Sequence, residues 1–145
     1  MADTSDNVRF LQNVPLFEGL NNRQLTKLAG RFIERKYAAG QEIVTQGLGG
    51  EGFFVIVSGK AEAVRTRADG EKVVVNTFWP AGYFGEIALL DNGVRTATVT
   101  ALEPTECLVL THWEFIAVLK EDADMAVDIL REVAKRFRLA LDRLQ

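Results

Sequence analysis

Glycine is distributed unevenly along the chain, and this distribution constrains the fold more than any other feature. Most of the twelve glycines fall between residues 37 and 111, whereas the stretch from Trp113 to Gln145 contains neither glycine nor proline. Glycines beside short apolar runs are typical of turns between strands, and a long stretch without helix breakers favours helix. The sequence therefore predicts a β-rich middle followed by a helical end.

The central stretch, residues 37–111, carries short apolar runs at regular intervals. They are Glu42 to Val44, Phe53 to Val57, Ala61 to Arg65, Val73 to Phe78, Thr98 to Thr100 and Cys107 to Leu110. Between the third and fourth runs, Asp69-Gly70 predicts a type I′ hairpin, which requires positive φ at both central residues. Short, evenly spaced strands with glycine turns predict a mainly β fold with flanking helices, an antiparallel β-roll or jelly-roll barrel.

Helical segments flank this middle. In residues 7–36, Asn21 or Asn22 can cap a helix, and its apolar side is formed by Leu25, Leu28, Ala29 and Phe32. Before residues 112–145, Thr111 is a candidate cap, with Glu114 completing a capping box. The helical spacing of the apolar residues after Asp128 predicts an amphipathic helix, with a stripe formed by Ile129, Val133, Phe137, Leu141 and Leu144. This stripe packs on its own domain, closes over a ligand or pairs with a second copy.

Composition excludes several classes of protein. A chain of 145 residues suits one domain spanning 1–145, and a net charge of −3 gives no support for nonspecific nucleic-acid binding. The polar start, Met1 to Asn7, does not resemble a secretory signal, and no apolar run is long enough to span a bilayer, so we expect a cytoplasmic protein. Cys107 is the single cysteine and is predicted to be a buried core residue.

One segment carries the chemistry. Gly85 interrupts the run from Pro80 to Leu90, where a short helical turn would leave backbone N–H groups free to bind an anion. Arg95 follows nine residues after Glu86 and can return to that turn to supply charge-assisted bonds. An ionised carboxylate only accepts hydrogen bonds, so Glu86 suits a ligand that carries a hydroxyl beside its anion.

The run from Phe84 to Leu90, followed by the run from Arg95 to Val99, resembles the phosphate-binding cassette of the cyclic-nucleotide-binding domain family. The resemblance covers nearly the whole chain, including Pro15-Leu16-Phe17 near the start and Ser58-Gly59 within the β-rich middle. Where the family often has proline before the cassette arginine, this chain has Val94.

The resemblance implies a role for each matching residue. Glu86 would accept the ribose 2′-hydroxyl, Gly85 would give backbone access beside Phe84, and Arg95 would pair with the phosphate oxygens. The remaining implied contacts are backbone N–H groups of Ile87 and Ala88, the hydroxyl of Thr96, the backbone of Ala97, and Val133 and Phe137 over the base.

The family resemblance implies a sensor of cyclic AMP or cyclic GMP that catalyses nothing, with no catalytic residue, metal or cofactor. Threonine at Thr96 favours or permits cyclic GMP in this family, yet cyclic AMP is the expected ligand because it is the more prevalent messenger. Binding would reposition the C-terminal helix, which would signal to an unidentified effector protein or to a second copy in a homodimer.

Three alternatives compete with this interpretation. A metal-dependent jelly-roll enzyme needs several converging ligands, and His112 is the only histidine. A transcription factor that binds DNA directly needs a further helical domain after the long helix, and no residues follow Gln145 in this sequence. A degenerate module that keeps the fold without the ligand, acting as an interaction domain, is disfavoured by the intact Glu86 and Arg95.

Overall fold

The computed structural model describes residues 4–49 and 51–144, which form two compact units. The β-roll unit runs from Phe32 to Trp113, and the helical unit combines the residues up to Arg31 with those from Glu114 onward. The β-roll unit contains β1 (Ile33–Tyr37), β2 (Glu42–Val44), β3 (Gly52–Ser58), β4 (Ala61–Thr66), β5 (Lys72–Phe78), β6 (Tyr83–Phe84), α3 (Ala88–Asp91), β7 (Thr98–Ala101) and β8 (Thr105–Thr111). The other elements are α1 (Thr4–Gln12), the 3-10 helix η1 (Pro15–Phe17), α2 (Asn22–Ala29), α4 (His112–Glu121) and α5 (Ala123–Arg143).

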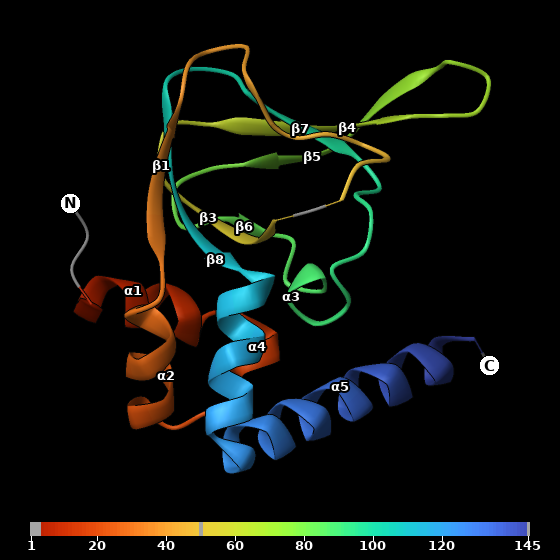
Figure 1. Cartoon of the computed structure of the whole chain (residues 1–145). Helices are drawn as coiled ribbons and strands as arrows, with labels where there is room; N and C mark the ends of the chain where they lie inside the picture. Colours follow the sequence, from red (N-terminus) through yellow and green to blue (C-terminus); the bar gives the residue numbers. More distant parts are fainter. Residues whose placement is uncertain (1–3, 50, 145) are drawn as a thin grey trace. The chain divides into compact units, whose positions relative to one another are not determined.

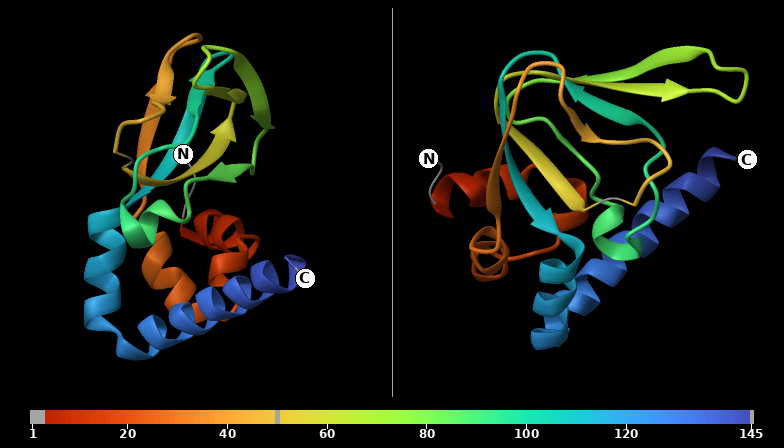
Figure 2. Two further views of the ribbon diagram at one scale, coloured as in Figure 1. Left: turned by 90° about the vertical axis from the view of Figure 1, so that its right-hand side faces the viewer. Right: turned by 45° about the horizontal axis from the view of Figure 1, so that its top comes forward.

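Two four-stranded antiparallel sheets build the β-roll (Figure 1). Their strand orders are β1-β8-β3-β6 and β2-β7-β4-β5. The predicted β-roll class is confirmed, and the two sheets are hydrogen-bonded separately rather than closed into a barrel. Figure 2 shows that the β4–β5 hairpin reaches beyond the neighbouring strands of its own sheet.

The core of the β-roll lies between the two sheets. Phe54 and Ile56 of β3 and Cys107 of β8 are fully buried there, and Val44 and Val99 are nearly so. Burying such side chains removes their apolar surface from water, which stabilises the roll by about 1.5–3 kcal/mol per large residue. The prediction that Cys107 is a buried core residue is confirmed.

The first strand was not visible in the sequence. The range 7–36 was predicted to be helical, but α2 ends at Ala29, Phe32 lies beyond it, and β1 begins at Ile33. Charged residues dominate β1 because it is an edge strand, paired on one side only with β8. An edge strand that is largely exposed lacks the apolar alternation by which strands are recognised.

The β4–β5 hairpin differs from its predicted turn type. Gly70 has φ +88°, but Asp69 does not have positive φ, so the turn is not type I′. The N–H of Gly70 donates to the carbonyl of Arg67 at 2.9 Å, and the N–H of Arg67 donates to that of Glu71 at 2.8 Å. This pattern is typical of a three-residue loop in which glycine occupies the left-handed position.

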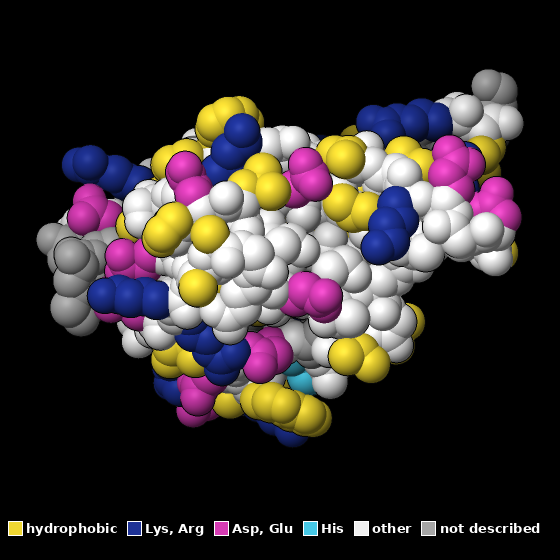
Figure 3. Space-filling model, turned by 90° about the horizontal axis from the view of Figure 1, so that it is seen from above, with side chains coloured by type: hydrophobic (Ala, Val, Ile, Leu, Met, Phe, Trp, Pro, Cys, Tyr) yellow, Lys and Arg dark blue, Asp and Glu magenta, His cyan; other side chains and the backbone are white. Residues whose placement is uncertain are grey.

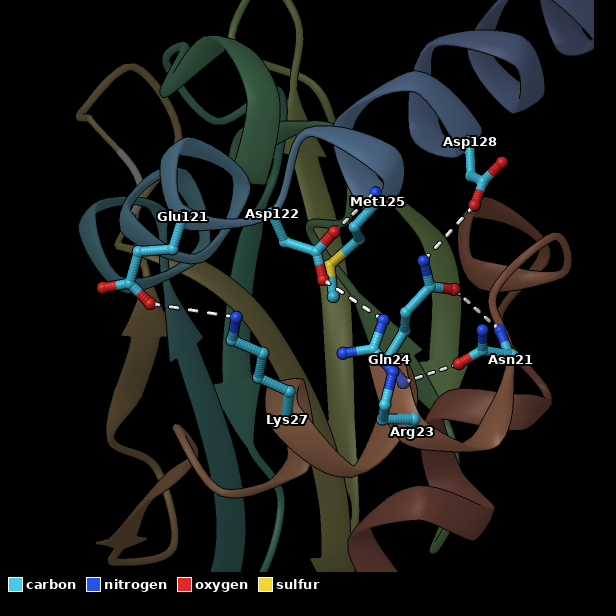
Figure 4. A network of polar contacts seen from close by, with 8 residues as sticks. All are labelled: Asn21, Arg23, Gln24, Lys27, Glu121, Asp122, Met125 and Asp128. Atoms are coloured by element: carbon cyan, nitrogen blue, oxygen red, sulfur yellow. Dashed lines mark hydrogen bonds and ion pairs between the residues drawn. The ribbon is translucent and has the colours of Figure 1, made fainter.

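In the helical unit, α2 is held by a capping box and by contacts with the C-terminal helices (Figure 4). The Asn21 side chain accepts from the N–H of Gln24 at 2.8 Å, and Gln24 in turn donates from Nε2 to Asp128 of α5 at 3.3 Å. The Asp122 carboxylate caps α5 by accepting from the N–H of Met125 at 3.0 Å. The predicted cap at Asn21 is confirmed, and the C-terminal region forms two helices because Asp122 starts a new one.

Two surface properties concern nucleic acid and membranes as possible partners: the distribution of charge and the hydropathy of the helices. On the face drawn in Figure 3, basic and acidic side chains are interspersed, and its described residues form no large basic area. No helix among the described residues has both the length and the apolar character needed to cross a bilayer.

Candidate ligand-binding site

Eight of the ten predicted site residues surround one cavity of about 590 Å³ in the β-roll unit. They are Phe84, Gly85, Glu86, Ile87, Ala88, Arg95, Thr96 and Ala97. Cavities of 300–1,000 Å³ are typical of small-molecule sites. The other two, Val133 and Phe137, lie on α5 in the helical unit, and their contact with the base stays a prediction.

Gly85 is required by the geometry of this site. Its φ of +87° lies in the left-handed region that residues with a side chain rarely adopt. A Cβ at this position would overlap the Arg95 guanidinium and the backbone carbonyl of Gly52. Glycine therefore lets the arginine pass close to the backbone of the cassette.

The Arg95 side chain makes two contacts at the end of the cavity where Gly85 lies. Its Nη2 donates to the Gly52 carbonyl at the start of β3, and its guanidinium carbon lies 5.7 Å from the centre of the Phe54 ring. Phe54 is itself stacked on Phe84, with ring centres 5.0 Å apart and planes only 4° from parallel. The cation therefore lies over the Phe54 ring, which Phe84 in turn supports by stacking.

The Arg95 guanidinium is partly desolvated and incompletely paired. Burial lowers the pKa of Arg95 from its ordinary value, while the nearby carboxylates of Glu51 and Asp91 act in the opposite direction. Arginine nevertheless stays charged in proteins. Its Nε is buried and has no hydrogen-bond partner among the described residues. A buried donor left unpaired is costly, so this arrangement fits an anion that is to be bound.

Backbone pairing fixes the position of Arg95. The N–H of Arg95 donates to the carbonyl of Leu48, and the N–H of Gly47 donates to the carbonyl of Arg95, both at 2.9 Å. Val94 forms a bridge with Gly49 beside them. The turn before it is closed by Asn92, whose φ is +51°, so the predicted return of the chain to the cassette is present.

The two predicted backbone donors differ from each other. The N–H of Ala88 already donates to the carbonyl of Gly85 at 3.0 Å. The N–H of Ile87 makes no backbone hydrogen bond within the described residues. Ile87 is therefore the better-placed donor for an anion in this conformation.

The opposite end of the cavity is apolar. Its walls come from the sheet β2-β7-β4-β5, with Val44, Ala63, Val75, Phe78 and Val99 among the lining residues. A cavity with a cationic end and an apolar end suits an amphipathic ligand, in which an anion is joined to a flat or apolar group.

The residues that position Arg95 are not among those predicted from the sequence. The sequence predicts a strand at Phe54 but no place for it in the site, and it does not point to the Gly52 carbonyl or to Glu51. Alternation along β3 could have assigned Phe54 to the inner face, but no sequence signal identifies a backbone carbonyl as a partner.

The described residues offer no group of side chains suited to hold a metal ion. Among the residues that the structure describes, no three histidine, cysteine or carboxylate side chains gather as ligands of one ion. His112 instead contacts a backbone carbonyl, with Nδ1 2.8 Å from the oxygen of Leu89.

The fold and the site define a β-roll domain with a cavity of the size of small-molecule sites, and comparison with known proteins identifies its family. The family model for the cyclic nucleotide-binding domain matches residues 34–122, so the chain belongs to the cyclic-nucleotide-binding domain family. The cassette resemblance is thereby confirmed at the level of the family.

Curated relatives include a cAMP-dependent protein kinase regulatory subunit from Mycosarcoma maydis, 42% identical over 98 residues, or 68% of this chain. The Cyclic AMP receptor protein of Thermus thermophilus is 32% identical over 130 residues, or 90% of this chain. These matches span 18% and 60% of the relatives' own lengths. Among solved structures, the N-terminal domain of a transcriptional regulator from Streptomyces coelicolor is 33% identical with a TM-score of 0.83. That match covers 92% of this chain and 95% of the other.

Proposed function

We propose that this chain senses cyclic AMP, with cyclic GMP as the second candidate ligand, and that it regulates a partner without catalysing a reaction. The observation that carries the proposal is the partly buried guanidinium of Arg95, whose buried Nε is unpaired, in a cavity that is also lined by apolar side chains. Support comes from two relatives whose names refer to cyclic AMP.

In this proposal the ligand lies along the cavity. The cyclic phosphate accepts from Arg95 and from the N–H of Ile87, and Glu86 accepts the ribose 2′-hydroxyl. The base extends toward the apolar walls around Ala63 and Val75, and Thr96 lies at the edge of the same cavity. Charge-assisted bonds fix the phosphate, while apolar contacts hold the base.

The output of the proposed sensor is carried by α5. On this helix Val127, Leu130, Phe137 and Leu141 are exposed, and so is its C-cap residue, Leu144. With Ala134 between them, they recur at alternating spacings of three and four residues, which is typical of a coiled-coil seam. We propose that this seam pairs with a second copy of the chain and that ligand binding shifts the position of the helix. Sedimentation of the wild type against Leu130→Glu tests the pairing, since a monomeric wild type would contradict it.

Calorimetry tests which nucleotide binds and whether its 2′-hydroxyl contributes. Cyclic AMP, cyclic GMP and their 2′-deoxy analogues are titrated into the protein. We expect saturable binding of cyclic AMP and weaker binding of its 2′-deoxy analogue, because Glu86 loses the hydroxyl that it accepts from. Absence of binding for both nucleotides would overturn the sensor proposal and favour a degenerate interaction module. Equal binding of the deoxy analogue would overturn only the role of Glu86.

A further inference from the structure

His112 connects two segments that adjoin the cationic end of the cavity, the chain before β3 and the helix α3. It is the first residue of α4 and follows directly after β8. Its ring Nδ1 lies 2.8 Å from the carbonyl oxygen of Leu89 in α3, and its backbone N–H donates to the carbonyl of Glu51 at 3.0 Å. One residue therefore contacts both the cassette helix and the chain just before β3.

Both segments that His112 contacts lie next to residues of the predicted site. Gly52, the neighbour of Glu51, accepts a hydrogen bond from the Arg95 guanidinium. Leu89 belongs to the turn that starts at Glu86, since its N–H donates to the Glu86 carbonyl at 3.2 Å. The distance between these two segments sets the space in which the arginine and the cassette backbone meet.

The ring contact has a chemical reason. Leu89 lies near the end of α3, which ends at Asp91, so its carbonyl has no helical N–H four residues later. The Leu89 side chain is fully buried, and an unpaired carbonyl in such surroundings would be costly. A carbonyl oxygen only accepts, so Nδ1 must carry the proton and donate it.

We propose that His112 is a positioning residue for the nucleotide: its Nδ1–H holds the cassette helix α3 in the geometry that binds the ligand. This inference rests on the proposed function. The chain's only histidine would then affect the ligand indirectly, through its hydrogen bond to the Leu89 carbonyl.

Two variants separate this role from a general effect on stability. The amide nitrogen of asparagine occupies the place of Nδ1, whereas that of glutamine occupies the place of Nε2. His112→Asn therefore keeps the donor toward Leu89, and His112→Gln loses it. Loss of one net hydrogen bond predicts about two- to tenfold weaker binding of cyclic AMP by His112→Gln, with near wild-type binding by His112→Asn.

A nearby tryptophan reports on the same place. The Trp113 ring packs edge-on against the His112 ring at 4.9 Å, and 72% of its surface is exposed. Trp79 is the other tryptophan, so Trp79→Phe leaves Trp113 as the single tryptophan, which is excited selectively over the two tyrosines. In this background, cyclic AMP should change the emission of Trp113 in the parent and in His112→Asn, and change it less in His112→Gln.

Calorimetry and fluorescence are run on all three proteins, with thermal melts to confirm folding. Equal affinity and equal emission change in the asparagine and glutamine variants would overturn the role of His112 while leaving the sensor intact. No binding by the wild type would overturn the proposed function itself and this inference with it.

A measurement on the wild type keeps the proposal testable if a variant fails to fold. Long-range proton–nitrogen NMR spectra of a chain with one histidine give one set of ring signals. We expect the Nδ1–H tautomer in the free protein and a shift of its signals on addition of cyclic AMP. A neutral ring protonated at Nε2, or signals that cyclic AMP does not move, would overturn the proposal.

Discussion

Arg95→Ala removes the cation from the end of the cavity where Gly85 and Ile87 expose the backbone. In the free protein the guanidinium is already partly buried, so ligand binding has less of its hydration to remove. A phosphate can accept two charge-assisted hydrogen bonds from its fork, each contributing about 1.5–3 kcal/mol. Taking the lower value for both, the variant loses about 3 kcal/mol of binding free energy, which is about 150-fold in Kd.

The assay is calorimetric titration of cyclic AMP into the wild type, Arg95→Ala and a control. Arg67→Ala is a matched control because it changes the net charge equally, and the Arg67 side chain on the β4–β5 hairpin is 57% exposed. We expect the control to bind within about twofold of the wild type, since exposed ion pairs contribute about 1 kcal/mol or less. A thermal melt of each variant verifies that it is folded.

Binding of cyclic AMP by Arg95→Ala within about threefold of the wild type would refute the role of Arg95, because it corresponds to less than half of the free energy taken for one of the two bonds. Equal losses of affinity in Arg67→Ala and Arg95→Ala would also refute it, because net charge rather than the site would then govern binding.

Three further perturbations follow from the backbone and the core. Gly85→Ala should lower the free energy of unfolding by about 1–3 kcal/mol and abolish measurable nucleotide binding, because the added Cβ overlaps Arg95; a melt and a titration check this. Ala81→Gly should raise the free energy of unfolding by about 0.5–1 kcal/mol in urea denaturation, because Ala81 has φ +73°. Burial raises the pKa of the Cys107 thiol from 9.0 to about 12. The free energy of unfolding should therefore be unaffected by this group below pH 9 and fall as pH rises toward 12, and denaturation at several pH values should show less decline in Cys107→Ala.

The central strands and the cassette were predictable because their signals are local. Gly85 and Asn92 mark conformations that few other residues adopt, and β3 and β8 are apolar over most of their length. The cap at Asn21 is also local, since its partner Gln24 lies three residues away. These features depend on residues near one another in the chain, so one sequence contains the information.

Other features depend on pairing across long sequence distances. β1 is a strand because it pairs with β8, although its own residues are mostly charged. β6 has only two residues, Tyr83–Phe84, and exists through its pairing with β3. No local pattern distinguishes such segments from loops.

By itself, the sequence determined the β-roll class, because glycine spacing and helix periodicity act over short distances, and it determined the family through the resemblance of its cassette runs. Only the tertiary structure decided how Arg95 is presented to a ligand. It brought the Phe54 ring and the Gly52 carbonyl into contact with the guanidinium, and the His112 ring into contact with the Leu89 carbonyl of α3. Each of these contacts joins residues that are 20 or more positions apart, and their meeting depends on how the strands fold together.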